Sequence, residues 1–174
     1  MIKRTILTAA CSILGFISAS GYATAETIGR LECSVVGAAS QEPIGDRDGH
    51  RLASVQFACF GADGLLKDAV YTGSATTEWD GPHGTFLSAG GIYRVPGGLA
   101  VSQAIEGTSS VVMKDGKPVG NESSGKTRFK FASGALAALS EKTARFEARP
   151  TGGGRFSLEY TADSATDTVG TAKQ

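Results

Sequence analysis

The sequence predicts an all-β domain, an antiparallel β-barrel of about 8–10 strands with one short helix. The stretch Gly84–Gly134 alternates short runs of β-branched, aromatic and hydroxyl residues with Gly, Pro, Asn and Asp, which stop or reverse strands. Within it, Lys114-Asp115-Gly116-Lys117 has the Asp-Gly pair of a tight hairpin. The chain's 24 glycines fall between apolar runs, as turns do. A β-sandwich is the alternative, since it also manages exposed strand edges.

Apolar and polar residues alternate over most of the predicted strands, which places one face of each strand toward a core. A long loop is expected over Gly37–Gly49, a bulge at Ala89-Gly90-Gly91, and the helix over Ser133–Glu141, capped by Ser133. The strands are predicted at Ile28–Val36, Leu52–Phe60, Asp68–Trp79, Thr85–Ser88, Gly91–Val95, Leu99–Glu106, Ser109–Met113, Pro118–Glu122, Thr127–Ala132, Thr143–Arg149 and Arg155–Thr161.

The amino terminus has the features of a signal peptide. Lys3 and Arg4 precede an apolar run, Ile6–Ile17, and Ala23-Thr24-Ala25 is a cleavage site. We therefore expect residues 1–25 to be removed, 26–162 to form the domain, and 163–174 to be a flexible tail. The run is shorter than the roughly 20 apolar residues of a membrane span, so the predicted location is periplasmic or secreted.

The cysteines and the charge balance fit that location. Cys11 lies in the predicted signal peptide, which leaves Cys33 and Cys59. Both are on the apolar faces of their strands, and an even pair in an oxidising compartment predicts a disulfide. Losing Lys3 and Arg4 from 17 basic residues, against 17 acidic ones, leaves the mature chain slightly acidic. Nucleic acid and anionic membranes are therefore poor partners.

Seven residues are candidates for binding a ligand inside the barrel. Strand alternation points the four phenylalanines and Tyr160 inward, and it also places Gln103 on the apolar face of Leu99, Val101 and Ile105. Trp79 is included as a stacking platform at a barrel mouth, the sharper interpretation of its cluster. A buried amide must find partners or line a cavity that is not fully dry. The candidates are Trp79, Gln103, Phe129, Phe131, Phe146, Phe156 and Tyr160.

Other polar residues are interpreted more simply. His50 and His83 lie among turn formers, where a solvated histidine is the default, and no metal-ligand spacing includes them. The cluster that contains Glu78, Asp80 and His83 is expected to be a strand end and a loop, although an acid and a base at a barrel mouth is the alternative. Tyr93, which precedes a Pro-Gly-Gly turn, is expected at a rim.

The second half of the chain resembles small barrels of the allene oxide cyclase and dirigent type. The resemblance lies in Gly84-Thr85-Phe86, in Ser133-Gly134-Ala135-Leu136-Ala137-Ala138-Leu139, and in Phe156-Ser157-Leu158-Glu159-Tyr160. It implies a barrel whose interior binds or guides hydrophobic or phenolic small molecules. No catalytic residue of that family can be matched to a position here, so none is carried over.

Together these patterns favour an exported barrel that binds a small apolar ligand or mediates an interaction in the cell envelope. The alternative is a small isomerase or cyclase that uses polar groups inside the barrel. An enzyme would need an inward ionisable group, whereas the polar residues on the predicted inward faces are mainly Gln103 and Tyr160, neither of them charged. No cofactor, metal or catalytic residue is predicted, and the oligomeric state stays open.

Overall fold

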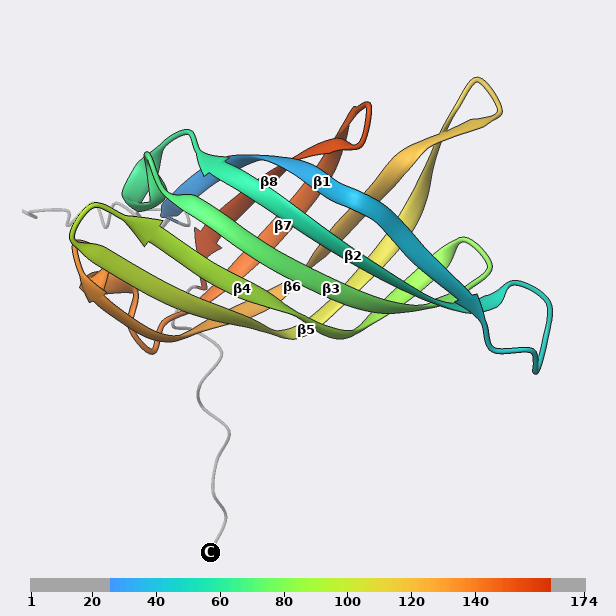
Figure 1. Cartoon of the computed structure of the whole chain (residues 1–174), viewed down its shortest axis with the longest axis horizontal. Coiled ribbons are helices and arrows are strands. Elements are labelled where there is room, and N and C mark those ends of the chain that lie inside the picture. Colours follow the sequence, from blue (N-terminus) through green and yellow to red (C-terminus); the bar gives the residue numbers. More distant parts are fainter. Residues whose placement is uncertain (1–25, 164–174) are drawn as a thin grey trace, which may run out of the picture.

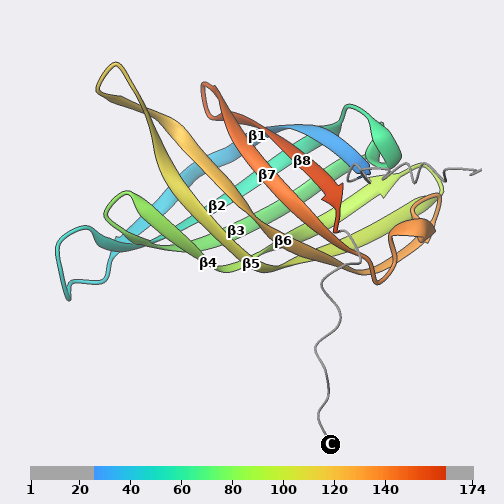
Figure 2. The ribbon, with the colours of Figure 1, turned by 180° about the vertical axis from the view of Figure 1, so that it is seen from behind.

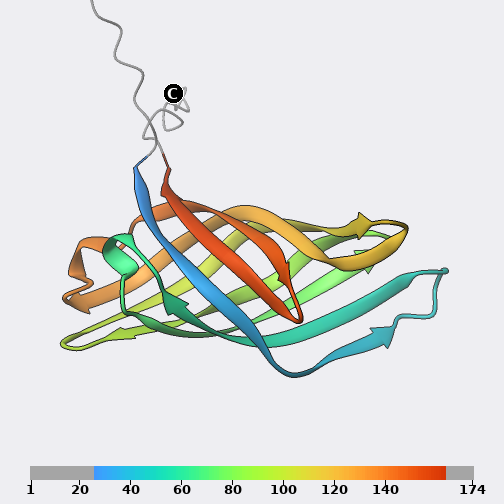
Figure 3. The same cartoon turned by 90° about the horizontal axis from the view of Figure 1, so that it is seen from above.

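The described chain forms a closed barrel of eight antiparallel strands joined in sequence order (Figure 1). The computed structural model describes residues 26–163. Its strands are β1 (Thr27–Pro43), β2 (His50–Gly61), β3 (Val70–Asp80), β4 (His83–Val95), β5 (Gly98–Lys114), β6 (Lys117–Gly134), β7 (Thr143–Gly152) and β8 (Arg155–Ala162). β8 pairs with β1 to close the sheet, as Figures 2 and 3 show. The predicted barrel is confirmed and the sandwich is excluded. The predicted signal peptide and residues 164–174 lie outside the described residues.

The two ends of the barrel differ. Two 3₁₀ turns, η1 (Gly64–Leu66) and η2 (Ala137–Leu139), lie at one end, and the β1–β2 loop and the β3–β4 and β5–β6 turns lie at the other (Figure 1). Leu66, Leu136 and Leu139 are almost fully buried, so the turns plug their end with leucine side chains. We call the plugged end the floor and the opposite end the mouth.

The predicted helix over Ser133–Glu141 is wrong except for the single turn η2. β6 runs on to Gly134, whose φ of +57° turns the chain out of the strand, so Ser133 caps nothing. A helix this short is costly to nucleate. Leu136 and Leu139, three residues apart, instead both enter the floor, which one 3₁₀ turn already achieves.

Several strand boundaries also differ from the prediction. β1 extends through most of the expected loop Gly37–Gly49, with an irregularity between Val36 and Ser40, and leaves only 44–49 outside the strands. β4 is continuous through the expected Ala89-Gly90-Gly91 kink. Its irregularity lies two residues before the expected kink, at Leu87. The Asp115-Gly116 hairpin is confirmed, with φ of 51° and 72° at its two central residues.

The predicted disulfide joins the first two strands inside the barrel. Cys33 and Cys59 are directly opposite each other in the β1–β2 ladder, with Cα atoms 4.0 Å apart, and their sulfurs are bonded. Both residues are buried. The alternation that placed them on the apolar faces of their strands was therefore correct.

The predicted inward face of β5 is wrong. Ala100, Ser102 and Ala104 point to the interior, while Gln103 is exposed and Ile105 is 59% exposed on the outside. Large aromatic rings from other strands fill the interior at this level. Over Ala100–Ala104, β5 therefore contributes small side chains to the interior, and Ile105 lies on the outer surface.

Phe131 is likewise outside, 57% exposed, although Phe129 is fully buried. On β5, the successive residues Val101 and Ser102 pair with Phe131 and Phe129 of β6, so the residue of β6 between the two phenylalanines has no pairing partner. An extra residue of this kind is a β-bulge, and it reverses which face the following side chains occupy. Strict alternation from Phe129 to Phe131 fails for this reason.

Candidate functional site

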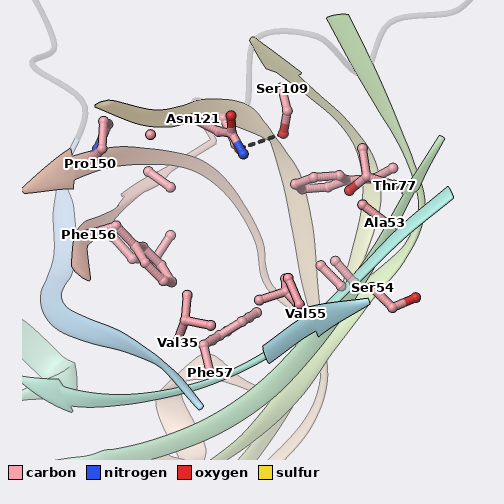
Figure 4. Close-up of a pocket in the computed structure, with 18 of the residues that line it drawn as sticks. Val35, Ala53, Ser54, Val55, Phe57, Thr77, Ser109, Asn121, Pro150 and Phe156 are labelled. Atoms are coloured by element: carbon pink, nitrogen blue, oxygen red, sulfur yellow. Dashed lines mark hydrogen bonds between the residues drawn. The ribbon is translucent and has the colours of Figure 1, made fainter. Parts of the chain in front are cut away.

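A cavity of about 570 Å³ lies inside the barrel between the floor and the mouth (Figure 4). Cavities of roughly 300–1,000 Å³ are the usual size for small-molecule sites. Its walls are mainly apolar, and Val35, Phe57 and Phe156 point into the same space in Figure 4. The larger apolar side chains that line it are Val35, Val55, Phe57, Trp79, Phe86, Val111, Val119, Phe146, Phe156 and Leu158.

Four of the seven predicted ligand-binding residues line this cavity. They are Trp79, Phe146, Phe156 and Tyr160. Phe129 is buried deeper, against Tyr93 and Tyr160, with ring centroids 5.6 and 5.9 Å away. Gln103 and Phe131 lie on the outer surface and are not part of the site.

Glycines make room for the aromatic walls. A Cβ atom on Gly84 would lie 3.0 Å from the Trp79 ring, and one on Gly91 would lie 2.6 Å from the Tyr71 ring. Gly107 pairs with Gly125 across β5 and β6, and a Cβ on Gly107 would lie 2.6 Å from the Phe86 ring. The glycines within the strands thus act as recesses for neighbouring rings as well as points of curvature.

Hydroxyl groups converge at the floor of the cavity. The Tyr93 hydroxyl donates a hydrogen bond to the Tyr160 oxygen at 2.8 Å, and the Ser102 hydroxyl donates to Tyr93 at 3.4 Å. Tyr71 stacks on Tyr93, with ring centroids 4.1 Å apart. Tyr71, Ser102 and Tyr160 also line the cavity, so hydroxyls of this cluster border the space a ligand would occupy.

Burial keeps these phenols protonated. It raises the pKa of Tyr71, and it raises those of Tyr93 and Tyr160 well above their ordinary value near 10. Removal from water disfavours the phenolate, and the neighbouring tyrosines add to the effect at Tyr93 and Tyr160. The floor therefore offers neutral hydrogen-bond donors and acceptors rather than a base. Tyr93 is fully buried there, which corrects its predicted place at a rim.

Arg51 and Trp79 face the cavity near its mouth. The guanidinium carbon of Arg51 is 5.3 Å from the centroid of the Trp79 ring, in a cation–π contact. The Nη1 atom of Arg51 donates to the carbonyl oxygens of Gly49 and Gly81, at 3.3 and 3.4 Å. No aspartate or glutamate is found among the described residues that line the cavity.

Sequence reasoning missed Arg51, although a signal was present. The predicted strand began at Leu52, with Val55, Phe57 and Cys59 inward. The strand begins at His50, and continuing the same alternation backward from Val55 gives Ala53 and then Arg51. An inward ionisable group therefore exists where the sequence prediction found none that was charged.

His50 is buried on the outer side of the mouth, which corrects its prediction as a solvated loop residue. Its Nδ1 atom is hydrogen-bonded to Asp46, and its Nε2 atom lies 2.8 Å from Glu78 Oε1. These two hydrogen bonds, Asp46 first, raise the pKa of His50, and the pKa of Asp46 is lowered by the same contact. The network joins the β1–β2 loop to β3, while His83 is exposed at the start of β4.

The arrangement can hold an apolar molecule, hydrogen-bond it at the floor and place a positive charge beside it at the mouth. In the described part of the chain, no helix is long and apolar enough to span a membrane, and no group of three or more metal-ligating side chains is found. Comparison of the chain with protein-family models, curated proteins and solved structures gave no match, and the resemblance to the allene oxide cyclase and dirigent barrels stays a prediction.

Proposed function

We propose that this protein binds a small, mainly apolar molecule inside the barrel. The cavity of about 570 Å³ is the observation that supports the proposal. Protein interiors are usually packed to the density of organic crystals, and voids larger than a water molecule are few. A cavity of ligand size inside the barrel, lined by aromatic and aliphatic side chains, is therefore a feature that a purely structural barrel does not need.

The chain offers an internal reporter for this proposal. Trp79 is its one tryptophan, and it lines the cavity. Titrating the protein with a neutral apolar probe, dodecanol or N-phenyl-naphthylamine, should change the emission of Trp79 saturably. A displacement titration with the second probe should give the same dissociation constant as direct binding.

A matched pair of variants places the binding inside the barrel. Ala75, on β3, is buried and lines the cavity. Ala58 is on the face of β2 that points away from the interior, opposite Ser34 of β1. Ala75→Phe should fill part of the cavity and weaken probe binding at least about tenfold, and Ala58→Phe should leave it unchanged. Ala104→Leu, also in the cavity wall, is the second variant if Ala75→Phe does not fold. Saturable binding that is equal in all variants would contradict the proposal, as would no binding by the wild type.

An envelope interaction is the second candidate, and the outer surface favours it. Leu87 and Ile105, on neighbouring strands, are 56% and 59% exposed, and Phe131 on β6 is 57% exposed. Large apolar side chains exposed on neighbouring strands can serve as a contact site for another protein or a second copy. Sedimentation of the wild type and of Phe131→Ser tests this, because a self-associating surface should lose its oligomers in the variant.

The isomerase or cyclase alternative is supported by the floor hydroxyls alone. Neutral phenols can polarise a ligand carbonyl by donating hydrogen bonds, as an oxyanion site does. Replacing Tyr71 by Phe would abolish such a role while leaving simple apolar binding in place. If the protein only binds its ligand, the affinity of Tyr71→Phe for the probe should change by no more than the loss of one hydrogen bond.

A further inference from the structure

We infer that the ligand of this barrel carries an anionic head group, a carboxylate in the simplest case, and that Arg51 binds it at the mouth. This inference rests on the proposed function, because the apolar part of such a ligand would occupy the cavity. It adds the chemical class of the ligand and the direction in which it lies, with its tail toward the floor.

The position of Arg51 is the first argument. It is on the inward face of β2, in register with Trp79 of β3, and it borders the cavity. The side chain is half-buried and lies against the Trp79 ring. A guanidinium on an apolar ring is partly removed from water yet keeps its charge, since arginine does not lose its proton in proteins.

The second argument is that Arg51 has no acidic partner. Among residues 26–163, its polar contacts are the two carbonyl oxygens that Nη1 reaches, at the outer limit of hydrogen-bond length. No carboxylate of the described residues forms an ion pair with it. A guanidinium has five N–H donors in a planar fork that matches a carboxylate, so most of this capacity is left for another group.

The third argument is where the acids of the mouth lie. Asp46 and Glu78 are paired with His50, and Asp80 is paired with Arg47 at 3.0 Å. All of these groups are on the outer side of the mouth or in the β1–β2 loop, because His50 and Glu78 have the opposite strand parity to Arg51 and Trp79. Their charges are largely balanced by one another.

The charge inside the mouth is therefore of one sign. Arg51 and Arg155 border the cavity, and no acidic residue does so among those described. Opposite them the floor is neutral, since its tyrosines stay protonated. A cavity with apolar walls, a neutral floor and a positive mouth is complementary to an apolar molecule with one anionic end.

The test uses one alkyl tail with three heads. Dodecanoate, dodecanol and dodecyltrimethylammonium are titrated into the protein at pH 8 and low ionic strength, below micelle formation, with binding followed by calorimetry. The expected affinity order is anionic, then neutral, then cationic, with dodecanoate about tenfold or more tighter than dodecanol. In Arg51→Gln the affinities for dodecanoate and dodecanol should differ by about twofold or less, because only the exposed Arg155 remains as a cation among the described lining residues, while dodecanol binding is retained.

Two variants guard the interpretation. Arg94→Gln removes an exposed arginine from the outer face of β4 near the floor and should keep the full preference, which excludes a general effect of net charge. Arg51→Lys keeps the charge and should keep part of the preference if Arg51→Gln disturbs the loops that Arg51 contacts. The preference should also shrink as salt is added.

The outcomes separate this inference from the proposed function. Equal affinity for the three heads, a preference for the cationic head, or an anionic preference that survives in Arg51→Gln would overturn the inference and leave apolar binding standing. Failure of every probe to bind would overturn the proposed function, and the inference with it.

Discussion

Removing the disulfide should lower the free energy of unfolding by more than the lost packing of the two sulfur atoms accounts for. The bond closes a loop with a sequence separation of 26 residues between β1 and β2. In the chain-entropy model a cross-link of this span stabilises the folded state by about 3.5 kcal/mol at 25 °C. With an unfolding entropy of about 2.1 cal/mol/K per residue and about 140 folded residues, this amounts to a Tm shift of about 12 °C.

A double-mutant cycle distinguishes the cross-link from the packing of its sulfurs. Cys33→Ala and Cys59→Ala each break the bond, so each should lose the whole cross-link contribution plus a smaller packing loss. The double variant loses the cross-link only once. The two single losses should therefore exceed the double loss by about 3.5 kcal/mol, measured by urea unfolding with the single variants kept reduced.

The neighbouring outward pair provides the control. Ser34 lies opposite Ala58, one step along the same ladder. Ser34→Ala should change the free energy of unfolding by less than about 0.5 kcal/mol. If the cysteine losses simply add, within about 0.5 kcal/mol, the bond contributes no cross-link stability and the argument from loop closure is refuted.

Three further predictions concern the mouth, the walls and the floor. Because the pKa of His50 is raised in the folded state, the protonated side chain stabilises the protein fully below about pH 6.5, and this contribution is lost as the pH rises through the folded-state pKa. The wild type should therefore have a higher Tm than His50→Gln at low pH, and the difference in Tm should shrink above the folded-state pKa. A difference in Tm that does not depend on pH would contradict this. Gly91→Ala should cost about 1–3 kcal/mol in urea unfolding, since its Cβ would lie 2.2 Å from the Thr72 carbonyl oxygen; a loss below about 0.5 kcal/mol would argue against crowding. Tyr93→Phe should lose about 1–2 kcal/mol, because Ser102 and Tyr160 lose a buried hydrogen-bond partner, and a variant as stable as the wild type would show that the floor network adds nothing.

The strands near the carboxyl end were predictable because nothing interrupts their alternation at the inward positions. Phe146, Phe156 and Tyr160 face the interior as predicted, and the Asp115-Gly116 turn fixed the longest hairpin. The cysteine pair was found by the same logic. In each case one face of the strand is apolar and buried, and the other is polar and solvated, so the alternation in the sequence shows directly which side chains are buried.

The sequence could not show where the larger apolar side chains of a strand face outward. On β5 the interior takes Ala100 and Ser102 because Tyr93 and Phe129, their pairing partners on β4 and β6, already occupy the space. The bulge that sends Phe131 outward depends on pairing between strands and has no local signal. His50 is hydrogen-bonded to Asp46 and Glu78, which the β1–β2 loop and the β2–β3 pairing bring together.

The plug of leucines at the floor has a kinetic consequence. Since η1 and η2 close one end of the barrel, any molecule that fills the cavity must come and go through the mouth. The cavity therefore has a single opening, so the end of a ligand that enters last is the end that leaves first. A ligand therefore leaves along the path by which it entered, past Arg51 and Trp79 at the mouth.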